Sequence, residues 1–247
     1  MKTFIKKIAY YATAWIPTKL ICKTAYALLR LRGEYSHCPK YQLKALMDLD
    51  NKLYGLQGML AIRYGDGVHT KHKHMKYHDF FTNNLEDGQT VIEIGCGYGA
   101  LAHSMATKKN ILLTAIDIVE KNILKAQQRF GECNITFIHG DATTHPFGNT
   151  FDVVVMSNVL EHIEDRVGIL QKIKTTLKPS KYIIRVPLYE RDWRVPLKEE
   201  LGLEHRLDPT HFTEYTLDSF QEEIASAGLH IEHLEVRWGE IWSIVKP

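Results

Sequence analysis

The stretch that decides the fold is Thr90-Val91-Ile92-Glu93-Ile94-Gly95-Cys96-Gly97-Tyr98-Gly99. A short apolar strand, residues 90–94, leads directly into three glycines at alternate positions. Glycine lets the backbone turn sharply and approach a ligand without a Cβ in the way. The spacing is G-x-G-x-G rather than G-x-G-x-x-G, which argues against a dinucleotide pyrophosphate site. The stretch therefore predicts a ligand-binding loop at the carboxyl end of the first strand of an open α/β sheet.

Strands and helices alternate after this loop. The predicted strands are residues 90–94, 111–117, 135–139, 151–156 and 182–186, the predicted helices are 100–107, 120–130, 161–177 and 216–227, and two further strands, 230–237 and 241–245, close the chain. Repeated β-α-β units with right-handed crossovers place helices on both faces of one sheet. The sequence therefore predicts an α/β fold with a Rossmann-like, seven-stranded, mostly parallel sheet whose last strand is antiparallel.

Polar residues follow the next three strands. Asp117 closes the second strand, 22 residues after Gly95, where a carboxylate can accept both ribose hydroxyls of a nucleoside. Asp141 follows the third strand, where it can accept from an adenine amine, and the fourth strand ends in Ser157-Asn158-Val159-Leu160-Glu161-His162. Because the carboxyl ends of parallel strands meet at one edge of the sheet, these groups predict a nucleoside pocket.

Over residues 85–247 the sequence resembles the class I S-adenosylmethionine-dependent methyltransferases, in particular their small-molecule, type 11-like branch. The resemblance rests on the loop at 93–99, on Asp117, on Gly140-Asp141-Ala142 and on Asn158-Val159-Leu160-Glu161-His162. It implies S-adenosylmethionine as the cofactor. The implied cofactor-binding residues are Gly95, Gly97, Glu93 and Cys96 in the loop, Asp117 at the ribose, Ile118, Asp141 and Ala142 at the adenine, and Ser157 and Tyr77 at the methionine end.

Methyl transfer of this kind is an in-line displacement, so the protein has to orient the acceptor and remove its proton. Two histidines are candidates for this catalytic role. His162 opens the predicted helix after the fourth strand, and His211 lies with His205 and Asp208 in a long insert, residues 187–215, of the kind that often forms a lid. His162 could instead cap a helix or lie in the core, and His211 could simply pin the lid.

The run from His69 to His78 contains several histidines, but no metal site is expected there. Its lysines, Lys71, Lys73 and Lys76, would repel a cation. A positively charged wall for the cofactor carboxylate or for an anionic substrate, or a solvated basic loop, fits the composition better.

The chain divides by charge into a basic N-terminal extension, residues 1–84, and the predicted cofactor-binding domain, residues 85–247. The extension holds 14 Lys or Arg against 5 Asp or Glu, whereas the remainder holds 17 against 24. In residues 1–32, which predict a helix broken at Pro17, every charge is positive and lies among aromatic and aliphatic residues. This segment predicts peripheral contact with a membrane surface, with packing on its own domain or on a second subunit as alternatives. Residues 40–64 predict another helix.

The expected reaction is methyl transfer to a hydroxyl or amine of a small, lipid-linked or glycan-linked acceptor. Nucleic acid is not the expected partner, because no RNA-binding module is recognisable and the fourth strand lacks an Asp/Asn-Pro-Pro-Tyr motif. An RNA methyltransferase and an inactive cofactor-binding subunit remain alternatives, and the oligomeric state is open. Four cysteines without disulfide or zinc spacing, no long apolar run and no cleavable signal predict a cytoplasmic protein, associated with the membrane face through residues 1–32.

Overall fold

The computed structural model describes residues 7, 11–66 and 68–247. The chain divides into two compact units, Met1–Gln57 and Gly58–Pro247. The second unit therefore begins well before residue 85. It includes the short helices α4 (Lys71–Met75) and α5 (Tyr77–Asn83), and α5 contributes Phe80 and Phe81 to its core.

Two helices make up most of the described part of the first unit. Helix α2 (Thr18–Glu34) begins directly after Pro17, whose ring removes a backbone donor that the first turn does not need. Helix α3 (Pro39–Tyr64) starts in this unit and runs on past its boundary. No residue of α2 is buried. None of the helices that the structure describes is both long and apolar enough to cross a membrane.

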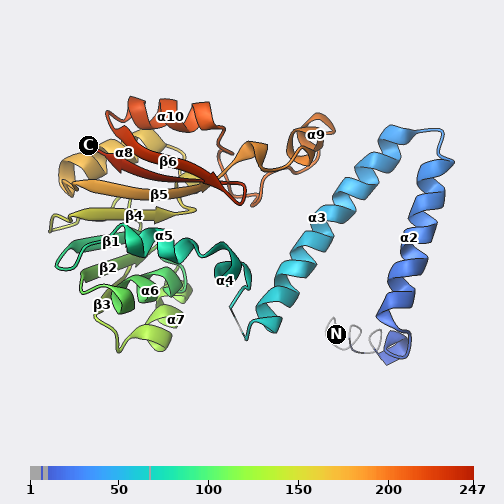
Figure 1. Ribbon diagram of the computed structural model, residues 1–247, viewed down its shortest axis with the longest axis horizontal. Coiled ribbons are helices and arrows are strands. Elements are labelled where there is room, and N and C mark those ends of the chain that lie inside the picture. Colours follow the sequence, from blue (N-terminus) through green and yellow to red (C-terminus); the bar gives the residue numbers. More distant parts are fainter. Residues whose placement is uncertain (1–6, 8–10, 67) are drawn as a thin grey trace. The chain divides into compact units, whose positions relative to one another are not determined.

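The second unit is built on a seven-stranded sheet in the order β3-β2-β1-β4-β5-β7-β6 (Figure 1). The strands are β1 (Thr90–Ile94), β2 (Leu112–Asp117), β3 (Ile135–His139), β4 (Val153–Ser157), β5 (Lys181–Pro187), β6 (His230–Arg237) and β7 (Glu240–Lys246). Strands β1 to β5 pair in parallel, and β7 lies antiparallel between β5 and β6. The predicted fold class is confirmed.

Helices cover both faces of the sheet, because successive strand residues point to opposite sides. On one face Val91, Val153 and Val155 pack with α5, α6 (Ala100–Lys108) and α7 (Glu120–Phe130). On the other face the core includes Ile92 and Met156 and is covered by α8 (Arg166–Thr176) and α10 (Leu217–Ser226). The carboxyl ends of β1, β2, β3 and β4 thus reach a common edge from a rigid, two-sided core.

One predicted helix begins later than expected. The helix predicted over 161–177 starts at Arg166, because the side chain of Asp165 accepts a hydrogen bond from Gly168 N at 2.9 Å and so caps it. Residues Leu160–His162 form a separate 3-10 turn, η1. As a consequence, Glu161 and His162 lie on the loop at the sheet edge and not within α8.

The segments of unclear periodicity also contain helices. The basic run from His69 to His78 forms α4 and the start of α5, separated by Lys76 in the left-handed region at φ 53°. The insert, residues 187–215, contains the 3-10 turn η2 (Tyr189–Arg191) and α9 (Arg194–Glu200). It returns to its starting point through a bridge between Leu188 and Tyr215.

Candidate functional site

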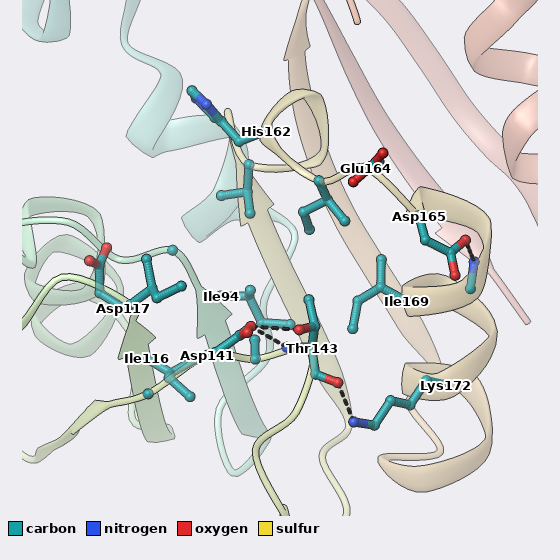
Figure 2. A pocket seen from close by; sticks show the side chains of 17 residues that line it. Ile94, Ile116, Asp117, Asp141, Thr143, His162, Glu164, Asp165, Ile169 and Lys172 are labelled. Atoms are coloured by element: carbon teal, nitrogen blue, oxygen red, sulfur yellow. Dashed lines mark hydrogen bonds between the residues drawn. The ribbon is translucent and has the colours of Figure 1, made fainter. Parts of the chain in front are cut away.

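A cavity of about 590 Å³ lies along the carboxyl edge of the sheet (Figure 2). This volume is in the range of small-molecule and cofactor sites. Its walls come from the ends of β1, β2 and β3, from the segment around η1 and from the first turns of α8. The lining residues are Ile94, Gly95, Ile116, Asp117, Ile118, Gly140, Asp141, Ala142, Thr143, Val159, His162, Ile163, Glu164, Asp165, Gly168, Ile169 and Lys172.

The glycine loop turns through left-handed conformations at the end of β1. Gly95, Gly97 and Gly99 have φ of 71°, 53° and 75°. A Cβ on Gly95 would lie 2.5 Å from a methyl group of Val159, and one on Gly99 would meet Ala126 and Phe137 at 3.0 Å. A Cβ on Gly97 would meet nothing within 4 Å. Gly95 and Gly99 are therefore required by packing, whereas Gly97 faces open space.

Asp117 fixes this loop from the end of β2. Its Oδ2 accepts from Gly97 N at 2.8 Å, and its Oδ1 accepts from Val119 N at 2.9 Å and from Asn122 Nδ2 at 3.0 Å. The carboxylate is buried yet lines the cavity. Because an ionised carboxylate offers about four lone pairs, it can still accept from a ligand hydroxyl.

Asp141, in the loop after β3, also lines the cavity (Figure 2). Its Oδ1 accepts from both Thr143 N at 2.8 Å and Thr143 Oγ1 at 2.7 Å, which holds the loop in a tight turn. Lys172 of α8 in turn donates to the Thr143 carbonyl. Ile118, the residue after Asp117, lines the cavity and leaves 65% of its surface exposed, so it is an apolar group suited to stack on a flat ring.

Five predicted cofactor residues lie outside the set that lines the cavity: Gly97, Glu93, Cys96, Tyr77 and Ser157. Glu93 and Cys96 are buried. Burial, together with the nearby charge of Asp117, raises the pKa of Glu93 to about 8. Tyr77 is buried beneath Arg185, whose guanidinium lies 3.7 Å from its ring centroid, and Ser157 is half-buried at the end of β4.

The structure brings the two candidate catalytic histidines together at one end of the cavity, opposite Lys172. His162 lines the cavity, and its ring centroid lies 4.5 Å from that of His211. His211 is buried, and its Nδ1 lies 2.7 Å from Glu214 Oε1. Burial and the neighbouring His211 lower the pKa of His162. His205 is not part of this pair; its carbonyl accepts from Arg191, which holds the insert in place.

Glu161 is fully buried beside these histidines. Neither of its carboxylate oxygens accepts a hydrogen bond from another described residue. Burial raises its pKa to about 8, although the charge of Arg185 and its own backbone amide favour the ionised form. Its backbone carbonyl accepts from Phe212 N at 2.7 Å, which ties the insert to the sheet edge.

Comparison with known proteins identifies a family that this part of the chain matches. Residues 91–180, from β1 to just before β5, match a family model described as a methyltransferase domain. Residues 91–180 thus form a methyltransferase domain similar to those of the class I S-adenosylmethionine-dependent enzymes. The match covers the glycine loop and the ends of β2, β3 and β4. S-adenosylmethionine is accordingly the cofactor of this methyltransferase family, as the sequence predicted.

Two curated relatives and one solved structure illustrate the likeness. The chain is 26% identical over 156 residues to 27-O-demethylrifamycin SV methyltransferase of Amycolatopsis mediterranei, covering 61% of this chain and 57% of that protein. It is 30% identical over 157 residues to phosphoethanolamine N-methyltransferase 1 of Arabidopsis thaliana, covering 61% and 32%. The chain thus spans from a third to just over half of these relatives' lengths.

Among solved structures, magnesium protoporphyrin IX methyltransferase of Synechocystis PCC 6803 with bound SAH aligns with a TM-score of 0.55 at 19% identity. The alignment covers 70% of this chain and 84% of that one. At this identity the likeness establishes the shared fold.

Several residues of the methyltransferase site were not predicted as site residues. The sequence places Glu161 in the motif after the fourth strand without giving it a role, and it does not single out Glu214, Thr210 or Arg185. Their roles depend on contacts across the fold: Thr210 Oγ1 lies 2.9 Å from His162 Nδ1, and Arg185 donates to Asn158 Oδ1 at 3.2 Å. The pair Glu161-His162, directly after a strand, was the one local signal that could have drawn attention to Glu161.

Proposed function

We propose that this methyltransferase transfers a methyl group from S-adenosylmethionine to a hydroxyl or amine of a small or lipid-linked acceptor. The observation that carries the proposal is the single cavity with nucleoside-binding acids at one end and a histidine pair at the other. The curated relatives carry an oxygen acceptor and a nitrogen acceptor in their names, which supports this range of acceptors.

In this proposal each wall of the cavity contacts one part of the cofactor. Asp117 accepts the ribose hydroxyls, and Asp141 with Ala142 borders the adenine edge. Ile118, exposed at the rim, stacks on the adenine face. Gly95 and Gly97 leave room for the methionine moiety, because neither carries a Cβ.

The acceptor then lies near the histidine pair. The cofactor supplies an electrophilic methyl group, and the protein has to orient the nucleophile in line and handle its proton. His162 is the better placed of the two for direct contact, because it lines the cavity. His211 is buried against it and bonded to Glu214, so it supports His162 from behind.

The test is transfer of isotopically labelled methyl from S-adenosylmethionine into a panel of phenols, amines and extracted lipids. Wild-type protein and His162→Ala are compared, with His230→Ala as the control, since His230 begins β6 at the opposite edge of the sheet. The proposal expects labelled product whose rate falls about 100-fold in His162→Ala and is unchanged in the control. Binding of S-adenosylhomocysteine without label transfer to any acceptor would instead indicate an inactive cofactor-binding subunit.

The N-terminal extension supports a further part of the proposal, contact with an anionic membrane surface. On α2, Lys19, Lys23 and Arg30 fall within about 40° of one another around the helix axis. Leu20, Leu28 and Leu31 occupy the adjoining face, and all three are exposed. Basic residues beside an exposed apolar face are typical of a helix that lies in the headgroup region.

Sedimentation with vesicles of anionic and of neutral lipids tests this contact. The variant Lys19→Glu/Lys23→Glu/Arg30→Glu should lose binding to anionic vesicles. The matched control reverses a basic stripe of similar spacing on α7, with Lys121→Glu/Lys125→Glu/Arg129→Glu. Equal loss in both variants, or no loss in the first, would contradict a specific role of α2. A change in oligomeric state without vesicle binding would point to a second subunit.

A further inference from the structure

Three potential ligands for a metal ion meet at the acceptor end of the cavity. A carboxylate oxygen of Glu161 and one ring nitrogen each of His162 and His211 lie within 4.8 Å of one another. Glu161 follows β4 directly, whereas His211 comes from the insert 50 residues later, so the fold brings them together. Two imidazoles and one carboxylate are a common ligand set for divalent transition metals.

The hydrogen bonds around the histidines fix which nitrogen is available. Glu214 accepts hydrogen bonds from the Arg191 guanidinium at Oε2 and from Leu207 N at Oε1, so a cation and an amide donor face its carboxylate. An ionised carboxylate can only accept, so Nδ1 of His211 carries the hydrogen. The second nitrogen, Nε2, then presents its lone pair in the neutral ring.

The same reasoning applies to His162. The hydroxyl of Thr210 donates to Asp208 Oδ1 at 2.7 Å, so its oxygen is left to accept from Nδ1 of His162 at 2.9 Å. Nε2 of His162 therefore also presents a lone pair. Such outer contacts, which orient a ligating histidine through its other nitrogen, are typical of metal sites.

The buried carboxylate of Glu161 is the third potential ligand. Neither of its oxygens receives a hydrogen bond from another described residue, although the side chain is fully buried. The charge of Arg185 favours the ionised form of this carboxyl, whereas the charges of Glu214 and Glu240 disfavour it. A buried carboxylate to which no other described residue donates is costly, so the site favours a cation or a shared proton among the three groups.

We propose that Glu161, His162 and His211 bind one divalent transition-metal ion, through Nε2 of each imidazole and the Glu161 carboxylate. Ligand atoms about 2.1 Å from a tetrahedral metal ion lie about 3.4 Å apart, so atoms separated by up to 4.8 Å must approach one another by up to about 1.4 Å when the ion binds. Of the three ligands, His162 lines the cavity, so an ion held by them would lie beside it. Resting on the proposed function, an ion there would bind an acceptor hydroxyl and lower its pKa, which favours oxygen over ammonium acceptors.

The test is titration of the chelator-treated, full-length protein with Co²⁺, followed by calorimetry and by visible absorption of the ion. The expected result is one Co²⁺ per chain with absorption bands from nitrogen and oxygen ligands. Glu161→Gln removes the carboxylate charge but no imidazole, and His162→Gln removes a partly exposed ligand with little effect on folding. Both variants should weaken this binding by more than about 100-fold, whereas His230→Gln should bind like the wild type.

Equal Co²⁺ binding by the wild type and both site variants, or no binding by folded wild-type protein, would overturn the proposal and leave a shared proton in the cluster. Displacement of Co²⁺ by an equal concentration of Mg²⁺ would contradict the choice of a transition metal, because imidazole ligands disfavour Mg²⁺. Titration of the same samples with S-adenosylhomocysteine separates the two proposals. Co²⁺ binding without cofactor binding would sustain the metal site and contradict the methyltransferase activity.

Discussion

The two ends of the cavity differ in whether their carboxylates already accept hydrogen bonds from other residues. At the end proposed to bind the nucleoside, Asp117 and Asp141 are already held by backbone donors a few residues away or across the loop. At the acceptor end, Glu161 is more deeply buried and accepts nothing from the other described residues. One end is preorganised by its own hydrogen bonds, whereas the other is completed only by a ligand, a proton or an ion.

The largest expected effect concerns Glu93, the buried carboxyl that departs from this pattern at the nucleoside end. Its folded pKa of about 8 is raised above the ordinary value of 4.5, so the neutral form favours the folded state. The resulting stability is fully present below pH 4.5 and is lost as the pH rises through 8. Urea denaturation across this range should show the free energy of unfolding falling. Glu93→Gln should reduce that fall by on the order of 3–5 kcal/mol and leave the share of Glu161, whose pKa is also raised to about 8. An unchanged slope in Glu93→Gln would show that other groups cause it.

The glycine loop provides a second comparison within the nucleoside end. Gly95→Ala should lower the free energy of unfolding by about 3 kcal/mol, because left-handed strain adds to the contact with Val159. Gly97→Ala should lower it by only about 1 kcal/mol, since its Cβ meets nothing within 4 Å. Gly97→Ala should nevertheless weaken binding of S-adenosylhomocysteine at least about tenfold, because the methionine moiety is proposed to occupy that space. Unimpaired binding in Gly97→Ala would move the methionine end elsewhere.

The free energy of unfolding should change in opposite directions when one carboxylate at each end of the cavity is replaced by an apolar residue. Asp117→Leu leaves the amides of Gly97 and Val119 without their acceptor and should lower the free energy of unfolding by about 2 kcal/mol. Glu161→Met removes a buried acceptor without a donor and should raise that of the metal-free protein by about 2 kcal/mol. Chemical denaturation of the chelator-treated proteins measures both. Destabilisation by Glu161→Met would mean that Glu161 already has a partner in the folded protein.

The smallest effect concerns Thr210, which contacts His162 from outside the proposed metal site. Thr210→Val removes the hydroxyl that accepts from His162 Nδ1 and should weaken Co²⁺ binding about tenfold. Thr175→Val is the matched control, because that hydroxyl bonds only to backbone carbonyls of its own helix, α8. Equal Co²⁺ affinity in Thr210→Val and the wild type would remove Thr210 from the site.

The difference between the two ends also explains what the sequence could predict. The nucleoside end is encoded locally: the glycines and Asp117 follow strands directly, so strand periodicity alone places them at one edge. At the acceptor end, His162 and His211 were predicted singly, but their contact depends on how the insert folds back over η1. The hydrogen bonds of Glu214 and Thr210 to these histidines follow from that tertiary arrangement, which no periodic pattern records. The start of α8 was misplaced because the cap at Asp165 outweighed helix periodicity in the preceding residues.

The most direct test of the account is calorimetric titration of the purified protein with S-adenosylhomocysteine, compared with Asp117→Ala. Asp87→Ala is the control, because Asp87 accepts from Asn110 N away from the cavity. The account predicts binding by the wild type and the control, weakened about 10- to 100-fold or lost in Asp117→Ala. A folded wild-type protein that does not bind, or an Asp117→Ala protein that binds equally well, would contradict the assignment of this cavity to the cofactor.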